Sequence, residues 1–196
     1  DKTKVIAKAG EQLAGFAPAG HSVRGAILDG LHQEAMMLDY TPPLRDMRFA
    51  LAELADINLI SSLPGYEDAG YDTAAAVLEE CAKFNEGVVA PLNLESDKNP
   101  SWFKDGEVTT APGFKAAFRQ FVEGGWQGLQ HPEEFGGQNL PKLIHAACSE
   151  MVNSASISFA LCPLLTDGAI EALLTAGDPG QQQTYIPPMI EGRWTG

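Results

Sequence analysis

The chain has 196 residues, of which 44% are hydrophobic, and 13 Lys and Arg against 26 Asp and Glu give it a formal net charge of −13. This length and apolar content are typical of one large globular domain, or of one domain with an appendage. The negative charge argues against nucleic acid and anionic membranes as partners, because both bind basic surfaces.

The sequence also favours a cytoplasmic protein. No apolar run is expected to approach the roughly 20 residues of a membrane span, and the N-terminus does not lead into the apolar block of a signal peptide. The three cysteines, Cys81, Cys148 and Cys162, are widely spaced, and none belongs to a C-x-x-C pair. Each lies among apolar residues, so we expect reduced thiols in the core.

Residues 1–39 are expected to form an N-terminal helical extension of uncertain origin. Their apolar residues recur at helical spacing in two groups, which Pro18-Ala19-Gly20 separates. The two groups are Val5, Ala9, Leu13 and Phe16, and then Ile27, Leu28, Leu31, Ala35 and Leu38.

A second pattern starts at Tyr40. Thr41 is placed to cap a helix that runs to about Asn58, with Leu44, Met47, Leu51 and Leu54 as its apolar stripe. The segment Ser61-Ser62-Leu63-Pro64-Gly65 then stops the helical pattern.

The next helix is predicted to begin at Asp72 or Thr73 and to reach Ala90. Pro91 is expected to end it, because the residue before a proline disfavours helical backbone angles. Residues 92–112 are polar and predicted to be irregular, with a hairpin turn at Asp105-Gly106. Such a long loop is either functional or a plain surface excursion.

Residues 112–196 are again predicted to be helical. The first runs from Pro112 to the Gly124-Gly125 stop, and the second begins at Leu140-Pro141. An apolar stretch from Ala155 to Leu165 follows, and a break is expected at Thr166-Asp167-Gly168. A further helix ends at Gly177, and a short one covers about 181–189. Nearly every segment is helical, so the predicted fold class is all-α.

The connecting stretch Gly124–Gly137 contains five glycines and one proline in fourteen residues, together with Trp126 and Phe135. Glycines reach backbone angles that other residues avoid, and buried aromatics attach a loop to a core. The stretch therefore predicts a sharply folded connector between two helical halves.

Searches for catalytic and metal-binding patterns give little. No two of His21, His32, His131 and His145 stand at a ligand spacing, so a structural or surface role is expected for each. Glu133-Glu134 is a candidate general base, although adjacent loop carboxylates are more often solvated or capping a helix. The stretch Ala155–Leu165 combines apolar and small residues, which would suit an aliphatic chain lying between helices, but the residues alone favour plain core packing.

Several ordered motifs nevertheless resemble the flavin-dependent acyl-CoA dehydrogenases, over roughly residues 40–196. They include Gly125-Trp126-Gln127-Gly128-Leu129 with Pro132-Glu133-Glu134-Phe135-Gly136-Gly137, and the later Leu165-Thr166-Asp167-Gly168-Ala169 and Gly177-Asp178. The opening Tyr40-Thr41-Pro42-Pro43-Leu44-Arg45-Asp46-Met47-Arg48-Phe49 resembles an extended bacterial branch of the family, which includes enzymes similar to methylthiopropanoyl-CoA dehydrogenase.

The resemblance implies a three-domain enzyme of which residues 40–196 are the N-terminal helical, bundle-like domain, cut before the β middle domain. Such enzymes convert acyl-CoA to trans-2-enoyl-CoA: a glutamate takes the α-proton and FAD takes the β-hydride. The family's flavin-binding run and its base fall beyond Gly196, so the chain alone is expected to be inactive. An acyl-CoA substrate, electron-transfer flavoprotein or a similar acceptor, and a homo-oligomer are the implied partners.

By the same resemblance, the acyl-lining helix falls near Ala160–Gly168, and Ala160, Leu161, Leu164 and Leu165 are the candidate substrate-binding residues. No catalytic, cofactor-binding or metal-binding residue is predicted within the chain. Two alternatives remain open: an acyl-CoA oxidase-like flavoenzyme, and a non-catalytic helical interaction module.

Overall fold

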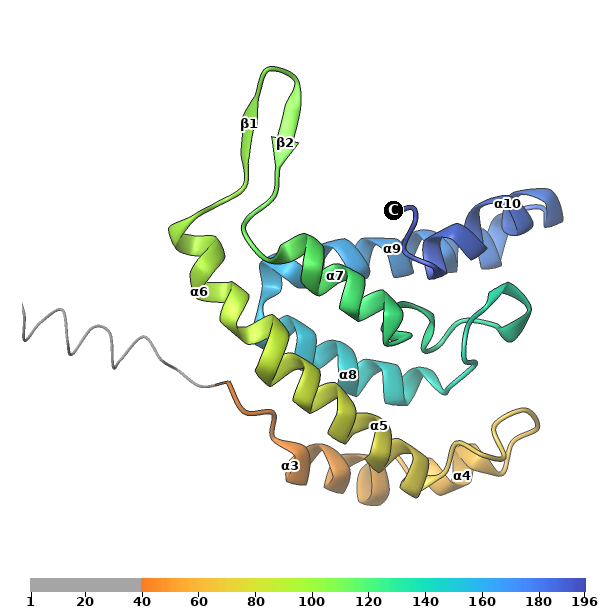
Figure 1. Cartoon of the computed structure of the whole chain (residues 1–196). Helices are drawn as coiled ribbons and strands as arrows, with labels where there is room; N and C mark the ends of the chain where they lie inside the picture. The colour runs from red at the N-terminus through yellow and green to blue at the C-terminus, as the bar shows by residue number, and fades with distance from the viewer. Residues whose placement is uncertain (1–39) are drawn as a thin grey trace, which may run out of the picture. The chain divides into compact units, whose positions relative to one another are not determined.

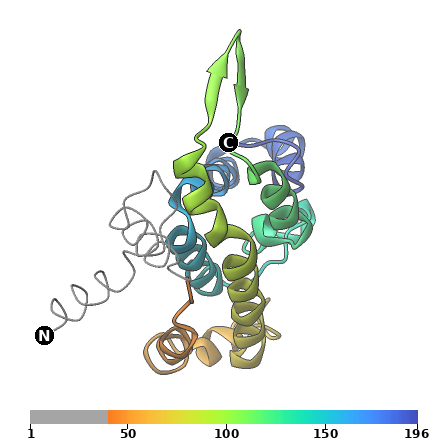
Figure 2. The same cartoon turned by 60° about the vertical axis from the view of Figure 1, so that its left-hand side comes forward.

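The computed structural model describes residues 40–196, and this part of the chain is a bundle of helices with one small β-hairpin (Figures 1 and 2). The predicted all-α class is confirmed. The two helices expected within 1–39 lie outside the described residues. The α-helices are α3 Leu44–Phe49, α4 Ile57–Ser61, α5 Tyr71–Phe84, α6 Ala90–Lys98, α7 Phe114–Glu123, α8 Lys142–Ala155, α9 Ile157–Ala176 and α10 Pro179–Ile190.

The prediction of the helix that starts near Thr41 is wrong in two respects, its cap and its end. Its N-cap is Pro43 rather than Thr41, and no side chain caps it. The helix α3 also passes into a π-helical turn, η1 (Ala50–Leu54), and the chain then breaks at Asp56, whose φ is 49°. Asp56 starts α4 by accepting a hydrogen bond from the backbone N–H of Leu59 at 3.2 Å, a capping role that Asp performs well.

The prediction that Pro91 ends a helix is also wrong. Helix α5 has Gly70 as its N-cap and continues through a π-helical turn, η2 (Asn85–Val89), directly into α6. Pro91 lies in the first turn of α6, where the missing N–H is tolerated. The helical path therefore reaches Lys98, and part of the segment expected to be irregular is helical.

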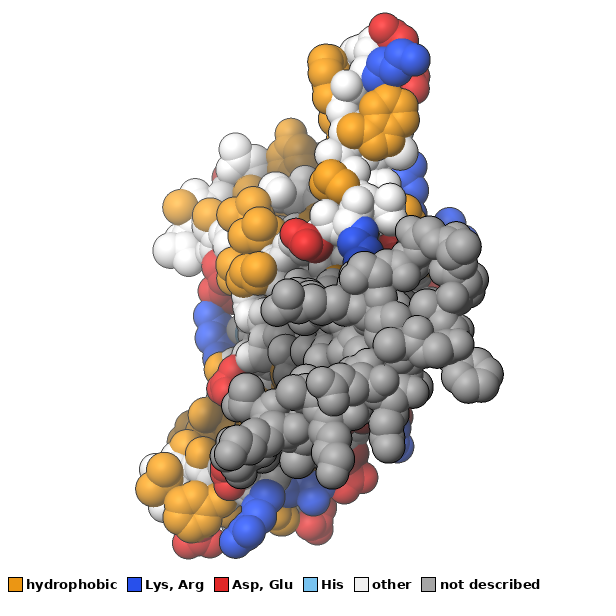
Figure 3. All heavy atoms as spheres, turned by 90° about the vertical axis from the view of Figure 1, so that its left-hand side faces the viewer, with side chains coloured by type: hydrophobic (Ala, Val, Ile, Leu, Met, Phe, Trp, Pro, Cys, Tyr) orange, Lys and Arg blue, Asp and Glu red, His pale blue; other side chains and the backbone are white. Residues whose placement is uncertain are grey.

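The predicted hairpin is confirmed. Strands β1 (Trp102–Lys104) and β2 (Glu107–Thr109) pair antiparallel around Asp105-Gly106, whose φ angles of 53° and 87° suit a tight hairpin turn. The hairpin projects from the helices, and its apolar side chains stand in the open at the top of Figure 3. Trp102, Phe103 and Val108 are between 52% and 71% exposed.

Helix α9 differs from its prediction because it runs without a break through Thr166-Asp167-Gly168. The Thr166 hydroxyl bonds back to the carbonyl oxygen of Cys162 at 2.9 Å, which satisfies this polar group inside the helix. Ser156 caps the helix by accepting from the backbone N–H of Phe159. Helix α10 follows after Gly177, close to the predicted boundaries.

Three clusters of buried apolar side chains hold the helices together. One joins α3, α5 and α8 around Leu78 and Met151, and a second gathers around Phe121 and Phe159. The third, built from Phe135, Ile170, Ile186 and Ile190, packs α10 against α9. Trp126 is partly buried between the first two clusters, so the glycine-rich loop is part of the core.

The cysteine prediction holds for two residues of three. Cys81 and Cys148 are buried free thiols, whereas Cys162 is exposed. The exposure of Cys162 follows from the uninterrupted course of α9, which carries this residue to the outer side of the helix.

Among the described helices, α9 alone is long and apolar enough to cross a membrane by length and composition, with a mean hydropathy of 1.6. A single such helix is weak evidence for a membrane span, because core helices of soluble proteins meet the same criterion. Its buried Asp167 is bonded to neighbouring segments of the chain.

Candidate functional site

The glycine-rich loop 124–137 folds tightly between α7 and α8. It contains two short 3-10 turns, η3 (Trp126–Gly128) and η4 (Glu133–Phe135), separated by a short bend. Gly125 and Gly136 have φ angles of 77° and 93°, in the left-handed region that favours glycine. A Cβ on Gly137 would overlap the backbone carbonyl of His131, so only glycine fits there. The sequence prediction of a sharp, pinned connector is confirmed.

The loop presents its residues in two directions. Trp126 stacks on Phe84 with ring centroids 6.3 Å apart, and Gln127 is buried beneath α9. The carboxylates of Glu133 and Glu134 both stand in solvent at the start of η4. Both lie in the first turn of η4, and acidic side chains are electrostatically favoured at the start of a helix.

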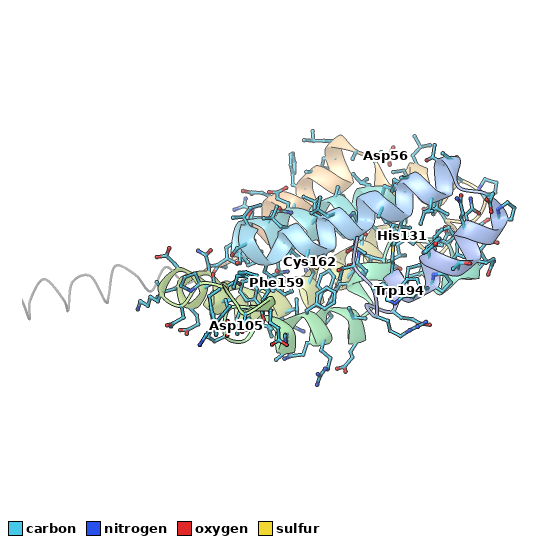
Figure 4. All side chains as sticks on the ribbon, turned by 90° about the horizontal axis from the view of Figure 1, so that it is seen from above. Asp56, Asp105, His131, Phe159, Cys162 and Trp194 are labelled. Atoms are coloured by element: carbon cyan, nitrogen blue, oxygen red, sulfur yellow. The ribbon has the colours of Figure 1, made fainter. Side chains whose placement is uncertain are left out.

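The four candidate substrate-binding residues all lie on the first half of α9, where Figure 4 labels Phe159 and Cys162. Leu161, Leu164 and Leu165 are 51%, 47% and 60% exposed, and Ile157 adds a further half-exposed aliphatic side chain. Ala160 is buried on the inner side of the helix. The structure thus brings three of the four together as an exposed aliphatic face and places Ala160 behind it.

Behind this face lies a small cavity between α8 and α9. It offers about 30 Å³ to the centres of water-sized molecules, which is room for one or two waters. The α9 side of the cavity includes Ala160, Pro163 and Leu164, and the α8 side includes His145, Ser149 and Asn153. Asp167 of α9 also lines the cavity, so both helices present polar as well as apolar side chains to it.

A buried polar cluster adjoins the cavity around Asp167 of α9, which is 9% exposed. Its Oδ1 accepts a hydrogen bond from Gln127 Nε2 at 2.8 Å and lies 2.8 Å from His131 Nε2. His145 Nε2 of α8 lies 3.2 Å from Oδ2 of the same carboxylate. A carboxylate only accepts hydrogen bonds, so each facing ring nitrogen carries the proton.

The cluster controls the charge of Asp167. Burial by itself raises the pKa of this carboxyl group, but the hydrogen bonds from His131 and His145 outweigh burial, so the pKa lies below the usual value of an aspartate. Asp167 is therefore ionised at neutral pH. The other ring nitrogen of His131, Nδ1, is buried without a hydrogen-bond partner in the described part of the chain, 3.9 Å from Glu171 Oε1.

Sequence reasoning did not single out this cluster. The histidines were expected to be structural or at the surface, and His131 is indeed a buried structural residue. Its partner Asp167 stands 36 residues away, and no short motif links the two positions. The contact exists because α9 packs against the loop, which is a tertiary feature.

A family model described as "Acyl-CoA dehydrogenase, N-terminal domain" matches residues 71–193. The 3-methylmercaptopropionyl-CoA dehydrogenase of Ruegeria pomeroyi is 43% identical over 159 residues, which cover 81% of this chain and 27% of that protein. A butyryl-CoA dehydrogenase of Syntrophomonas wolfei is 30% identical over 162 residues, covering 81% and 26%. The chain thus spans about a quarter of the length of these relatives.

A solved structure titled as the electron transferring flavoprotein of Acidaminococcus fermentans has the same fold, with a TM-score of 0.53 and 22% identity, over 63% of this chain and 30% of that chain. The family match covers the helices that carry the loop, the polar cluster and the aliphatic face. The chain therefore belongs to the acyl-CoA dehydrogenase family, as an N-terminal helical domain of that family of oxidoreductases.

Proposed function

We propose that this chain is the acyl-binding part of a longer FAD-dependent acyl-CoA dehydrogenase, which converts an acyl-CoA to the trans-2-enoyl-CoA. In this proposal residues 1–39 are an extension and residues 40–196 are the N-terminal domain. The cytoplasmic enzyme is a homo-oligomer that passes its electrons to electron-transfer flavoprotein or a similar acceptor. The chain alone is inactive.

The exposed aliphatic face of α9 is the observation that supports this proposal best. Ile157, Leu161, Leu164 and Leu165 are each about half exposed. Leaving such side chains in water forfeits roughly 1 kcal/mol apiece compared with burial. A contiguous apolar face of this kind marks a binding surface. An acyl tail, worth about 0.8 kcal/mol for each CH₂ that it buries, fits a wall of this chemistry.

The same face does not suit the flavin itself. FAD carries a pyrophosphate, which binds to basic side chains or to clustered backbone N–H groups. The wall of α9 is aliphatic, and the whole chain has a net charge of −13. We infer that residues outside this chain hold most of the FAD and supply the base. When bound, FAD supplies the acceptor for the β-hydride.

The contribution of this chain is then to bind and orient the acyl group and to exclude water from it. Leu161, Leu164 and Leu165 form one side of the acyl site, and Ala160 lies one turn before Leu164 on the buried side of the helix. Two of the relatives are named for their substrates, 3-methylmercaptopropionyl-CoA and butyryl-CoA. We therefore propose a short acyl chain for this enzyme.

Substituting Leu164 tests the wall in the full-length protein. Leu164→Trp fills space beside the tail, so we expect the ratio of kcat/KM for octanoyl-CoA to that for butanoyl-CoA to fall about tenfold or more, because a lost CH₂ contact and a clash each cost about 1–3 kcal/mol. Leu59→Trp is the control, since Leu59 is also an exposed leucine but lies on α4. An unchanged ratio in Leu164→Trp removes this residue from the acyl site.

The electron acceptor needs a separate measurement. An oxidase-like enzyme of the same chemistry transfers the electrons to oxygen and yields hydrogen peroxide. We expect turnover of the full-length protein to require an added electron acceptor and to produce little peroxide. Stoichiometric peroxide without an added acceptor would assign the oxidase reaction instead.

A further inference from the structure

The wall-forming half of α9 contains a weak point. Pro163 lies inside the helix between Leu161 and Leu164. A proline in a helix interior has no N–H to donate to the carbonyl four residues earlier, and its ring crowds that carbonyl. The turn that carries the candidate acyl-binding leucines is therefore held less firmly by its own backbone than a regular helical turn.

The buried polar cluster braces α9 in the turn that follows the proline, from Pro163 to Asp167. The side-chain amide of Gln127 lies 3.4 Å from the carbonyl oxygen of Pro163 and donates to Asp167 Oδ1 at 2.8 Å. One buried side chain from the glycine-rich loop thus contacts both ends of the turn from Pro163 to Asp167. Gln127 is only 1% exposed, so water does not compete for these bonds.

The brace is also directional. Asp167 is bonded from the loop by Gln127 and His131, and from α8 by His145. Contacts from two neighbouring segments fix both the rotation of α9 about its axis and its position along that axis. Apolar packing alone is far less directional, because hydrogen bonds require defined distances and angles and the hydrophobic effect does not.

We propose that Gln127 and Asp167 are positioning residues for the acyl-binding wall: they hold the turn around Pro163 so that Leu161, Leu164 and Leu165 face the acyl group. This inference rests on the proposed function of α9. Neither residue touches substrate in this account. Both act through the helix that they hold.

The test uses the full-length enzyme and its substrate preference. In Asp167→Ala the turn is released, so we expect KM for butanoyl-CoA to rise about tenfold or more, and the octanoyl-to-butanoyl ratio of kcat/KM to change, because small misplacements of binding groups have effects of this size. The ratio does not depend on how much enzyme is folded. Asp167→Asn keeps a carbonyl oxygen for Gln127 and is expected to restore most of the wild-type KM.

Two further variants make the result decisive. Gln127→Met removes the amide while keeping a similar volume, and it carries the same expectation as Asp167→Ala if the latter does not fold. Ile57→Ala is the matched control: Ile57 is fully buried in the cluster around α3, α5 and α8, so its loss destabilises the protein without altering α9. We expect a lower Tm but a wild-type ratio and KM in this control.

The outcomes separate the two proposals. A wild-type enzyme that oxidises no acyl-CoA refutes the proposed function before any variant is compared. If the wild type is active and Leu164→Trp alters the preference, while Gln127→Met and Asp167→Ala keep the wild-type ratio and KM, the positioning role is refuted and the acyl wall stands.

Discussion

Asp167 remains ionised inside the protein because polar side chains from two neighbouring segments compensate its charge. Gln127 and His131 approach one carboxylate oxygen, and His145 approaches the other. Burying an unpaired carboxylate is costly, whereas a carboxylate that accepts several hydrogen bonds keeps its charge. The cluster therefore ties α9 to the loop most strongly while Asp167 is deprotonated.

This arrangement predicts a specific acid sensitivity. The folded-state pKa of Asp167 lies below the value of about 3.9 for an unfolded aspartate. Its contribution to the free energy of unfolding is therefore complete above that unfolded value and is lost as the pH falls through the lower, folded one. We expect Asp167→Asn to be less stable at neutral pH and to lose stability less steeply below about pH 4.

Urea unfolding of the two proteins at a series of pH values measures this difference. Parallel stability curves for wild type and Asp167→Asn in acid would mean that Asp167 gains nothing from its histidine partners.

Two glycines give a second prediction with opposite signs. A methyl group at Gly137 would overlap the carbonyl of His131, so Gly137→Ala should destabilise the protein by about 1–3 kcal/mol. Gly87 is helical, and a methyl group there meets no atom within 4 Å, so Gly87→Ala should stabilise the protein by about 0.5–1 kcal/mol. Thermal unfolding measures both changes in stability. Equal changes for the two variants would show that the loop backbone shifts to make room for a methyl group at Gly137.

The sequence was informative about the loop but not about its partners. Five glycines with Trp126 and Phe135 predicted a tight, buried connector, because each glycine carries a local backbone requirement. The contact between His131 and Asp167 left no trace in the local pattern, since it depends on how α9 packs.

At the scale of elements, the sequence placed most helices correctly but misjudged where several of them end or break. Pro91 was expected to stop a helix, yet the π-helical turn before it leaves the proline in a first turn, where it is tolerated. Thr166-Asp167-Gly168 was expected to be a break, yet its polar side chains are satisfied by Cys162 and by the buried cluster. Residues that usually end a helix do not end it where a tertiary or intrahelical hydrogen bond satisfies their polar groups.

The start of α10 offers a prediction about capping. Asp178 accepts a hydrogen bond from the backbone N–H of Gln181, and the Gln181 side chain accepts one from the backbone N–H of Asp178, both at 2.9 Å. Removing such a cap costs about 0.5–2 kcal/mol, so Asp178→Ala should lower stability by that amount.

Gln183→Ala is the control for this cap, because Gln183 is an exposed residue of the same helix without a capping role. Its effect should stay within about 0.5 kcal/mol of wild type. Equal unfolding free energies for the two variants would show that α10 is held by its packing on Ile170 alone.

At the scale of the molecule, the polar cluster and the aliphatic wall lie on adjoining sides of one helix, and Leu164 and Asp167 line the same cavity. The inner side of α9 carries Asp167 and the buried Phe159 and Ile170, and the outer side carries the exposed leucines. The resemblance visible in the sequence located this helix from its distance to Gly177, whereas composition alone favoured core packing. Only the structure showed that three of the four candidate residues face outward.

The central claim is that this helix lines the acyl site of a flavin-dependent dehydrogenase. Anaerobic titration of the full-length protein with butanoyl-CoA, followed by flavin absorbance, tests it most directly. The account predicts that the bound flavin is bleached as the enoyl-CoA forms, and that Leu164→Trp is bleached by butanoyl-CoA but far less by octanoyl-CoA. A flavin that stays oxidised with butanoyl-, octanoyl- and palmitoyl-CoA, or a protein that carries no flavin, would contradict it.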